Sequence, residues 1–164
     1  MRSALAQIDA AFGDAPRPPD GELLHEQCMD DNDIVRLYPV QHWRELPDEL
    51  VESEYAALSF LSPDGFRHFI PAYMGFTLRR LDSGAAAVDS TIWSLAPVFY
   101  EDAAIQDFTA SKFASFTERQ RAAVVATSPV RAISLFKRDV WGLEANSPEA
   151  SRRLRAAIKE HATS

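Results

Sequence analysis

The chain has 164 residues, of which 46% are apolar and 10% aromatic, and this composition suffices for one domain with a hydrophobic core. The net charge of −7 argues against a nucleic-acid partner, because a protein that neutralises many phosphates needs a basic field. No membrane-spanning apolar stretch and no secretory signal are recognisable, and one cysteine excludes an intramolecular disulfide, so we expect a single cytoplasmic domain over residues 1–164 that binds no membrane.

The first segments alternate helix signals with breakers. Apolar residues at helical spacing predict a helix over residues 1–12, and Gly13 and the Pro-rich residues 16–19 can end it. Asp20 is suited to cap a second helix that carries Leu23, Leu24 and Cys28 and ends in the acidic stretch that follows.

The next segment leads to another helix start. We expect residues 34–40 to be extended, and a helix to begin at Pro47, whose ring suits the first helical position. Its inward side chains are predicted to be Leu50, Val51, Tyr55 and Leu58.

The strongest helix signal begins at Ser62. Its hydroxyl can accept from a first-turn amide, Pro63 needs no donor there, and Asp64 complements the helix dipole. Apolar residues then recur at spacings of three and four along one predicted buried face: Phe66, Phe69, Ile70, Tyr73, Met74, Leu78 and Leu81. Pro71 interrupts this pattern and predicts either a kink or two abutting helices.

The last third continues as helices with one ambiguous segment. Thr91–Phe99 is rich in β-branched and aromatic residues but contains Pro97, so it is either an edge strand or a buried extended link. A helix is predicted around residues 105–116, a capping box marks Thr117–Gln120, and Ser-Pro pairs at 128–129 and 147–148 mark further helix starts. The fold class is therefore mainly α: an irregular helical bundle with at most one short strand or hairpin near residues 91–99.

A family resemblance rests on the same central stretch. The string LSFLSPDGFRHFIPAYM at residues 58–74 resembles the signature of a family of uncharacterised bacterial proteins, known only as a domain of unknown function. Weaker blocks lie at Trp43 with the following Leu-Pro, at residues 93–97 and at residues 116–120. The resemblance covers about Phe12 to Ala126, and it implies no activity and no catalytic residue.

The charges divide the chain into unlike halves. From Asp20 to Glu54 eleven acidic residues oppose two arginines, whereas nine basic residues outnumber five acids from Thr117 onward. Such asymmetry fits self-complementary packing, head-to-tail association, or a basic partner docking on the acidic face. The basic stripe of the last helix, Arg152, Arg153, Arg155 and Lys159, is interpreted as a solvated helix face.

Metal chemistry has one candidate near the acidic stretch. His25 and Cys28 are three residues apart, and Asp30, Asp31 or Asp33 could supply a third ligand. No second His or Cys pair follows, so we predict no metal and no cofactor, and we retain the three aspartates as binding candidates.

Four further residues are nominated for binding. His68 could act as an acid or base with Asp64, although a packing role is favoured, and Arg67 could bind an anion or simply cover apolar surface. Trp43, beside His42, could anchor an interface or lie in the core with a partner for its indole N–H.

These patterns favour a non-enzymatic protein-binding module with a basic protein partner, for example one that neutralises a basic toxin or nuclease or acts as a regulatory partner. We assign no catalytic residue. One alternative is a metal-assisted hydrolase that uses His25, His68 and the three aspartates. The other alternative is a structural homo-oligomer whose oppositely charged halves complement each other.

Overall fold

The computed structural model describes residues 2–26, 28, 34–95 and 103–127. These residues form α-helices joined by short 3₁₀ turns, which confirms the mainly helical fold class. The elements are α1 (Arg2–Phe12), η1 (Asp20–Glu22), η2 (Val35–Leu37), η3 (Trp43–Glu45), α2 (Asp48–Ser53), α3 (Ala57–Phe60), α4 (Pro63–Arg80), α5 (Ala86–Ser94), α6 (Ala103–Ala114) and α7 (Glu118–Thr127).

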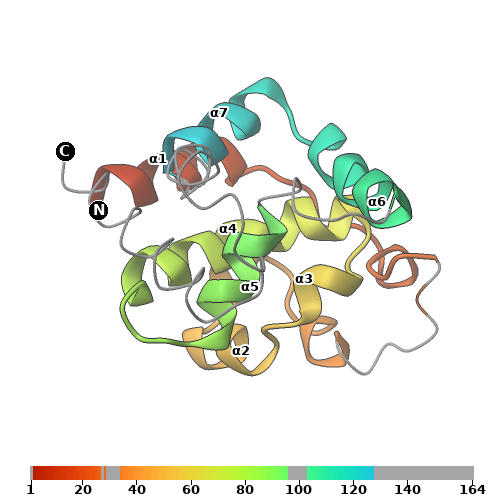
Figure 1. Cartoon of the computed structure of the whole chain (residues 1–164), viewed down its shortest axis with the longest axis horizontal. Coiled ribbons are helices and arrows are strands. Elements are labelled where there is room, and N and C mark those ends of the chain that lie inside the picture. Colours follow the sequence, from red (N-terminus) through yellow and green to blue (C-terminus); the bar gives the residue numbers. More distant parts are fainter. Residues whose placement is uncertain (1, 27, 29–33, 96–102, 128–164) are drawn as a thin grey trace.

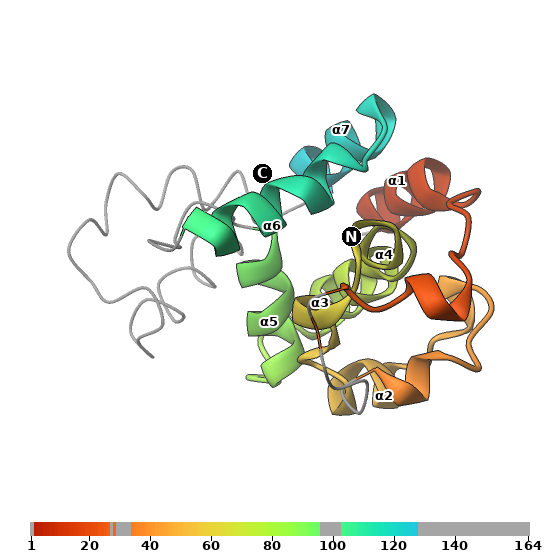
Figure 2. The same cartoon turned by 90° about the vertical axis from the view of Figure 1, so that its right-hand side faces the viewer.

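Helix α4 is the centre of the packing. It contacts α1, α2, α5, α6 and η3, while α7 packs on α1. Figures 1 and 2 show α4 across the middle of the molecule, with α1 and α7 above it and α2 below it in both views. The core therefore surrounds one helix and has no layered arrangement.

The start of α4 confirms the sequence signals. The Ser62 side chain accepts from the Gly65 amide at 3.1 Å, and Pro63 occupies the first turn. Gly65 has a packing role as well, since an added Cβ would lie 2.7 Å from the Leu23 carbonyl oxygen. Pro71 lies inside one continuous helix, so the prediction of two abutting helices is wrong.

The burial of α4 exceeds the prediction of one apolar face. Five of the predicted inward residues, from Phe66 to Met74, are buried, and Leu78 and Leu81 are partly buried. His68, Ala72 and Phe76 are buried as well, so that neighbours cover this helix almost all round. A helix buried in this way shows no clean polar stripe.

Two further start signals are confirmed. At α7 the Gln120 amide donates to Thr117 Oγ1 at 3.2 Å, and Gln120 Oε1 accepts from the Thr117 amide at 3.0 Å. This reciprocal pair is the predicted capping box. Helix α2 follows Pro47 as expected, but it ends at Ser53 and leaves Tyr55 47% exposed, which corrects the inward placement of Tyr55.

The helix predicted from Asp20 is wrong beyond its first turn. Among the described residues of this segment only η1 forms, and Leu24 instead makes an isolated antiparallel bridge with Leu61. The His25 amide donates to Phe60 O at 2.9 Å, and the Ser62 amide donates to Leu23 O at 2.8 Å. Because these backbone groups pair with the chain before α4, they are not available for helical hydrogen bonds.

The expectation of extended structure is also wrong for residues 34–40 and for the described part of Thr91–Phe99. Residues 34–40 contain the 3₁₀ turn η2, which buries Ile34 and Leu37 three residues apart. Thr91 to Ser94 belong to the last turn of α5, where Thr91 Oγ1 donates to Ala87 O at 2.6 Å. Within the described ranges there is no named strand, and residues 96–99 and the helices predicted after Ser128 lie outside those ranges.

None of the helices that the structure describes combines the length and the apolar character that a bilayer span requires.

Candidate functional site

Three of the nominated residues meet at the end of α1. Trp43 Nε1 donates to Phe12 O at 3.0 Å, His42 Nε2 lies 3.2 Å from Gly13 O, and His68 Nδ1 lies 3.0 Å from Ala15 O. We call His42, Trp43 and His68 the ring cluster. Their hydrogen bonds go to carbonyl groups at and after the C-terminus of α1, where carbonyls have no intrahelical partner.

His68 is the most deeply buried member of the ring cluster. Its side chain projects from α4, the residue is 1% exposed, and its Nε2 has no hydrogen-bond partner. The His68 ring lies edge-on to Phe69 at 4.8 Å and to His42 at 5.9 Å between centroids. Burial lowers the pKa of His68 below its usual value. The hydrogen bond to Ala15 O opposes this shift, whereas the positive charge of Arg17, and of His42 when it is protonated, adds to it.

His42 shapes the start of η3. Its Nδ1 accepts from the Arg44 amide at 3.1 Å, while Glu45 Oε2 accepts from the His42 amide at 3.3 Å. The imidazole thus replaces the hydroxyl or carboxylate oxygen of an ordinary capping box. The same ring reaches back to Gly13 and so joins η3 to the end of α1.

Trp43 lies in the core, with its indole N–H paired as a buried tryptophan requires. The Arg44 guanidinium covers its ring at 4.9 Å and pairs with Asp9. The hydrogen bond from Arg44 lowers the pKa of Asp9. Trp43 is only 9% exposed, so the area that it offers to a partner is small.

Arg67 lies in different surroundings from the ring cluster. It donates to Ser115 O at 3.0 Å and pairs with Asp64 at 3.1 Å, which leaves its Nε buried without a partner. Asp64 therefore pairs with Arg67, whereas the hydrogen bond of His68 goes to Ala15. Arg67 holds the start of α4 against the end of α6.

The metal candidates are only partly described. The His25 ring packs on Phe108 at 4.1 Å between centroids, and Cys28 Sγ lies 3.8 Å from Phe60 O. Asp30, Asp31 and Asp33 lie outside the described residues. Among the side chains that the structure describes, no group of three His, Cys, Asp or Glu could hold a metal ion.

One buried charged group was missed by sequence reasoning. Lys112 on α6 is 5% exposed, and its Nζ donates to Leu58 O at 2.7 Å near the end of α3. The ammonium lies over the rings of Phe108 and Phe66, at 4.0 and 5.0 Å from their centroids. Burial lowers the pKa of Lys112 to about 8. Its position four residues after Phe108, on the apolar side of a predicted helix, was the available signal.

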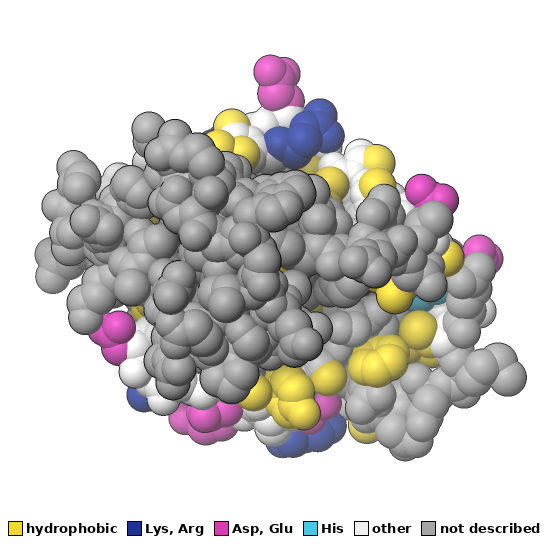
Figure 3. All heavy atoms as spheres, in the orientation of Figure 1, with side chains coloured by type: hydrophobic (Ala, Val, Ile, Leu, Met, Phe, Trp, Pro, Cys, Tyr) yellow, Lys and Arg dark blue, Asp and Glu magenta, His cyan; other side chains and the backbone are white. Residues whose placement is uncertain are grey.

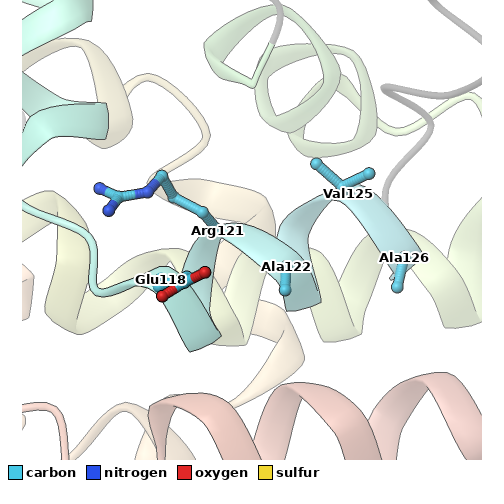
Figure 4. Close-up of a pocket in the computed structure, with 5 residues that line it drawn as sticks. All are labelled: Glu118, Arg121, Ala122, Val125 and Ala126. Atoms are coloured by element: carbon cyan, nitrogen blue, oxygen red, sulfur yellow. The ribbon is translucent and has the colours of Figure 1, made fainter.

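A shallow groove lies along α7. Its described wall consists of Glu118, Arg121, Ala122, Val125 and Ala126, shown in Figure 4. The side chains of Ala122 and Ala126 are short, and Val125 is 56% exposed. Because these residues lie on a single helix and only one acid and one base flank them, this wall shows no arrangement suited to a reaction.

Comparison with known proteins identifies a family. The chain belongs to the family described as Family of unknown function (DUF6714), which matches residues 1–130. This confirms the resemblance to a domain of unknown function and covers the whole described part of the chain. No curated protein and no solved structure matches the chain.

Proposed function

We propose that this chain is a non-enzymatic protein-binding module that docks a basic protein partner on its acidic N-terminal side. Figure 2 shows the red-to-orange part of the chain, from α1 to α2, along one side of α4. The acidic segment between Asp20 and Glu54 lies within this part. A partner with a basic face would meet a surface of opposite charge there.

The observation that carries this proposal is how the arginines of that region, and Arg79 of α4 beside it, are used. Ion pairs with carboxylates engage Arg17, Arg36, Arg44 and Arg79. In contrast, Glu22, Glu26, Glu49 and Glu52 are exposed and have no ion pair within the described part of the chain. The internal pairs therefore leave an excess of negative charge at the surface.

The unpaired acids of this surface that are closest together in the sequence lie on α2. Glu49 and Glu52 are three residues apart, which places both on one side of a helix. In Figure 3 acidic side chains lie at several places around the rim, including the lower edge, where Figure 1 places α2. Exposed like charges of this kind speed association and set specificity more than they add affinity.

A charge-reversal experiment tests the proposal. The full chain, the double variant Glu49→Lys with Glu52→Lys, and a control variant Asp107→Lys with Glu118→Lys would each be used for affinity capture from native cell extract. The two variants change the net charge equally, but the control acids lie on α6 and α7. We expect one protein to co-purify stoichiometrically with the wild type, and its Kd to rise about tenfold or more in the α2 variant, with loss of binding at high salt.

Two results would contradict this function. One is the absence of any stoichiometric partner for the folded wild-type chain. The other is an equal loss of binding in both variants, which would assign the effect to net charge and not to α2. Light scattering of the wild type at low and high salt separates a homo-oligomer from a heteromeric complex.

A further inference from the structure

The segment after α1 is held in place by side chains. Residues 13–19, called the connector, accept hydrogen bonds from His42 and His68 at two of their carbonyls. From the connector itself, Arg17 donates to Tyr38 O at 2.8 Å and to Val40 O at 2.9 Å. The backbone hydrogen bonds described for the connector are local turns, such as Ala15 N to Phe12 O at 2.9 Å. The hydrogen bonds that attach it to η3 and α4 therefore come from a few side-chain donors, and the burial of Ala15 in the core adds apolar contacts.

The hydrogen bonds of His42 fit only a neutral ring. Gly13 O can only accept, so Nε2 of His42 carries the hydrogen, and the Arg44 amide can only donate, so Nδ1 is unprotonated. A proton added to Nδ1 would point at the Arg44 N–H and remove the cap of η3. Arg44 Nη1 also lies 3.4 Å from His42 Nε2, so a charged ring would adjoin a guanidinium.

The surroundings of His68 also favour a neutral ring. Because Ala15 O can only accept, Nδ1 of His68 is the protonated nitrogen, and Nε2 carries a lone pair. That nitrogen is buried and has no partner. Its protonation would leave both a charge and an N–H without an acceptor in the core, which is unfavourable in a medium of low polarity.

The charged groups around the two rings disfavour protonation of either imidazole. Arg44 from η3 and Arg17 from the connector bring cations, and the pKa of His68 is lowered by the charge of Arg17 and by that of His42 when His42 is protonated. The carboxylates on the neighbouring elements offer little compensation. Asp9 of α1 already pairs with Arg44, Asp20 pairs with Arg17, and on α4 Asp64 pairs with Arg67. The remaining nearby negative charges belong to Asp14 and Glu45, which are both exposed, and Glu45 accepts from the His42 amide.

We propose that His42 and His68 form an acid-sensitive latch, which holds the connector on η3 and α4 while both rings are neutral and releases it when both are protonated. Release opens the boundary between α1 and α4 next to Phe12, whose ring packs edge-on against Phe116 at 5.7 Å. The latch is independent of the acidic docking surface and of its partner.

Hydrogen exchange of the full chain at about pH 7.5 and about pH 5 tests the latch, with rates corrected for the intrinsic pH dependence of exchange. We expect protection in peptides covering residues 13–19 and 38–46 to fall about tenfold or more in acid. A tenfold fall corresponds to a difference of about one unit between the histidine pKa values of the closed and open states. Protection in α4 should remain. Equal loss of protection in α4 would show global acid unfolding and would overturn the latch.

Matched variants identify the groups that respond. Asparagine places an amide near the position of Nδ1 without a titrating group, so His42→Asn with His68→Asn can keep the cap of η3 and the bond to Ala15. We expect this double variant to lose the acid response of the connector, and the control His25→Asn, which alters a ring on Phe108, to retain it. Opening of the double variant to the wild-type extent would overturn the assignment.

Nitrogen NMR of the imidazole rings in the wild type keeps the proposal testable if the double variant does not fold. At about pH 7.5 we expect His68 as the neutral Nδ1–H form and His42 as the neutral Nε2–H form. The opposite tautomer, or a charged ring, at either position would refute the latch without any mutation.

Discussion

His68 and Lys112 are two buried bases in different surroundings. Each donates to a backbone carbonyl of a distant segment: His68 to Ala15 after α1, and Lys112 to Leu58 in α3. Burial lowers the pKa of both. An imidazole with a lowered pKa is neutral at neutral pH, whereas an amine with a pKa of about 8 remains largely charged.

The difference lies in the partners that each charge has. The Lys112 ammonium lies over two aromatic rings and donates to the Leu58 carbonyl of α3, and both kinds of contact stabilise a cation. The His68 ring faces another imidazole and a nearby arginine, which disfavour a cation. Similar burial therefore supports a charge at one site and excludes it at the other. This comparison predicts separate pH responses for the two sites.

The largest expected effect comes from Phe66→Ala. Phe66 is fully buried, stacks on Phe116 at 6.0 Å between centroids, and lies 5.0 Å from the Lys112 ammonium. We expect the free energy of unfolding to fall by about 3–5 kcal/mol, as for other buried phenylalanines. Denaturant unfolding measures this loss. Tyr55→Ala is the exposed control and should change the free energy by less than about 0.5 kcal/mol.

Lys112→Met tests the charged site. The lowered pKa means that the unfolded chain binds more protons above pH 8, so wild-type stability should rise by about 2 kcal/mol between pH 8 and pH 10. Above about pH 10 the raised pKa of Tyr73 acts in the opposite direction, which sets the upper limit of the window. Denaturant unfolding across this window should show the rise in the wild type and in the control Arg80→Met, but not in Lys112→Met. A rise that persists in Lys112→Met would assign it to another group.

The elements that sequence reasoning predicted correctly depend on local chemistry. Ser62 and Pro63 start α4, and Thr117 and Gln120 start α7, through hydrogen bonds that span three residues. The helix predicted from Asp20 failed because Leu24 pairs with Leu61, which lies 37 positions along the chain. No local pattern reports that competition.

The candidate site was predictable to a similar degree. Sequence reasoning nominated all three residues of the ring cluster and predicted that a buried tryptophan would need a partner for its N–H. It could not locate that partner, because the Phe12 carbonyl lies 31 residues before Trp43. The missed Lys112 has the same cause, since its acceptor lies 54 residues away.

His68→Phe tests the neutral site. The phenylalanine keeps a ring in the core but removes the donor to Ala15 O, so at about pH 7.5 we expect a loss of about 1–3 kcal/mol. The pKa of His68 is lower in the folded chain than in the unfolded chain. Its contribution is therefore present above about pH 6.5 and is lost as the pH falls through the lowered value. In urea unfolding, the difference between wild type and variant should thus shrink in acid. A constant difference down to about pH 5 would contradict a neutral buried His68.

Trp43→Phe gives the smallest effect and separates hydrogen bonding from titration within the ring cluster. The variant loses the bond from Nε1 to Phe12 O, which is worth about 0.5–1.5 kcal/mol in a buried position. Indole does not titrate in this range, so the loss in urea unfolding should be the same at about pH 7.5 and about pH 5. If this loss instead shrank in acid as expected for His68→Phe, the acid response would belong to opening of the whole cluster and not to its imidazoles.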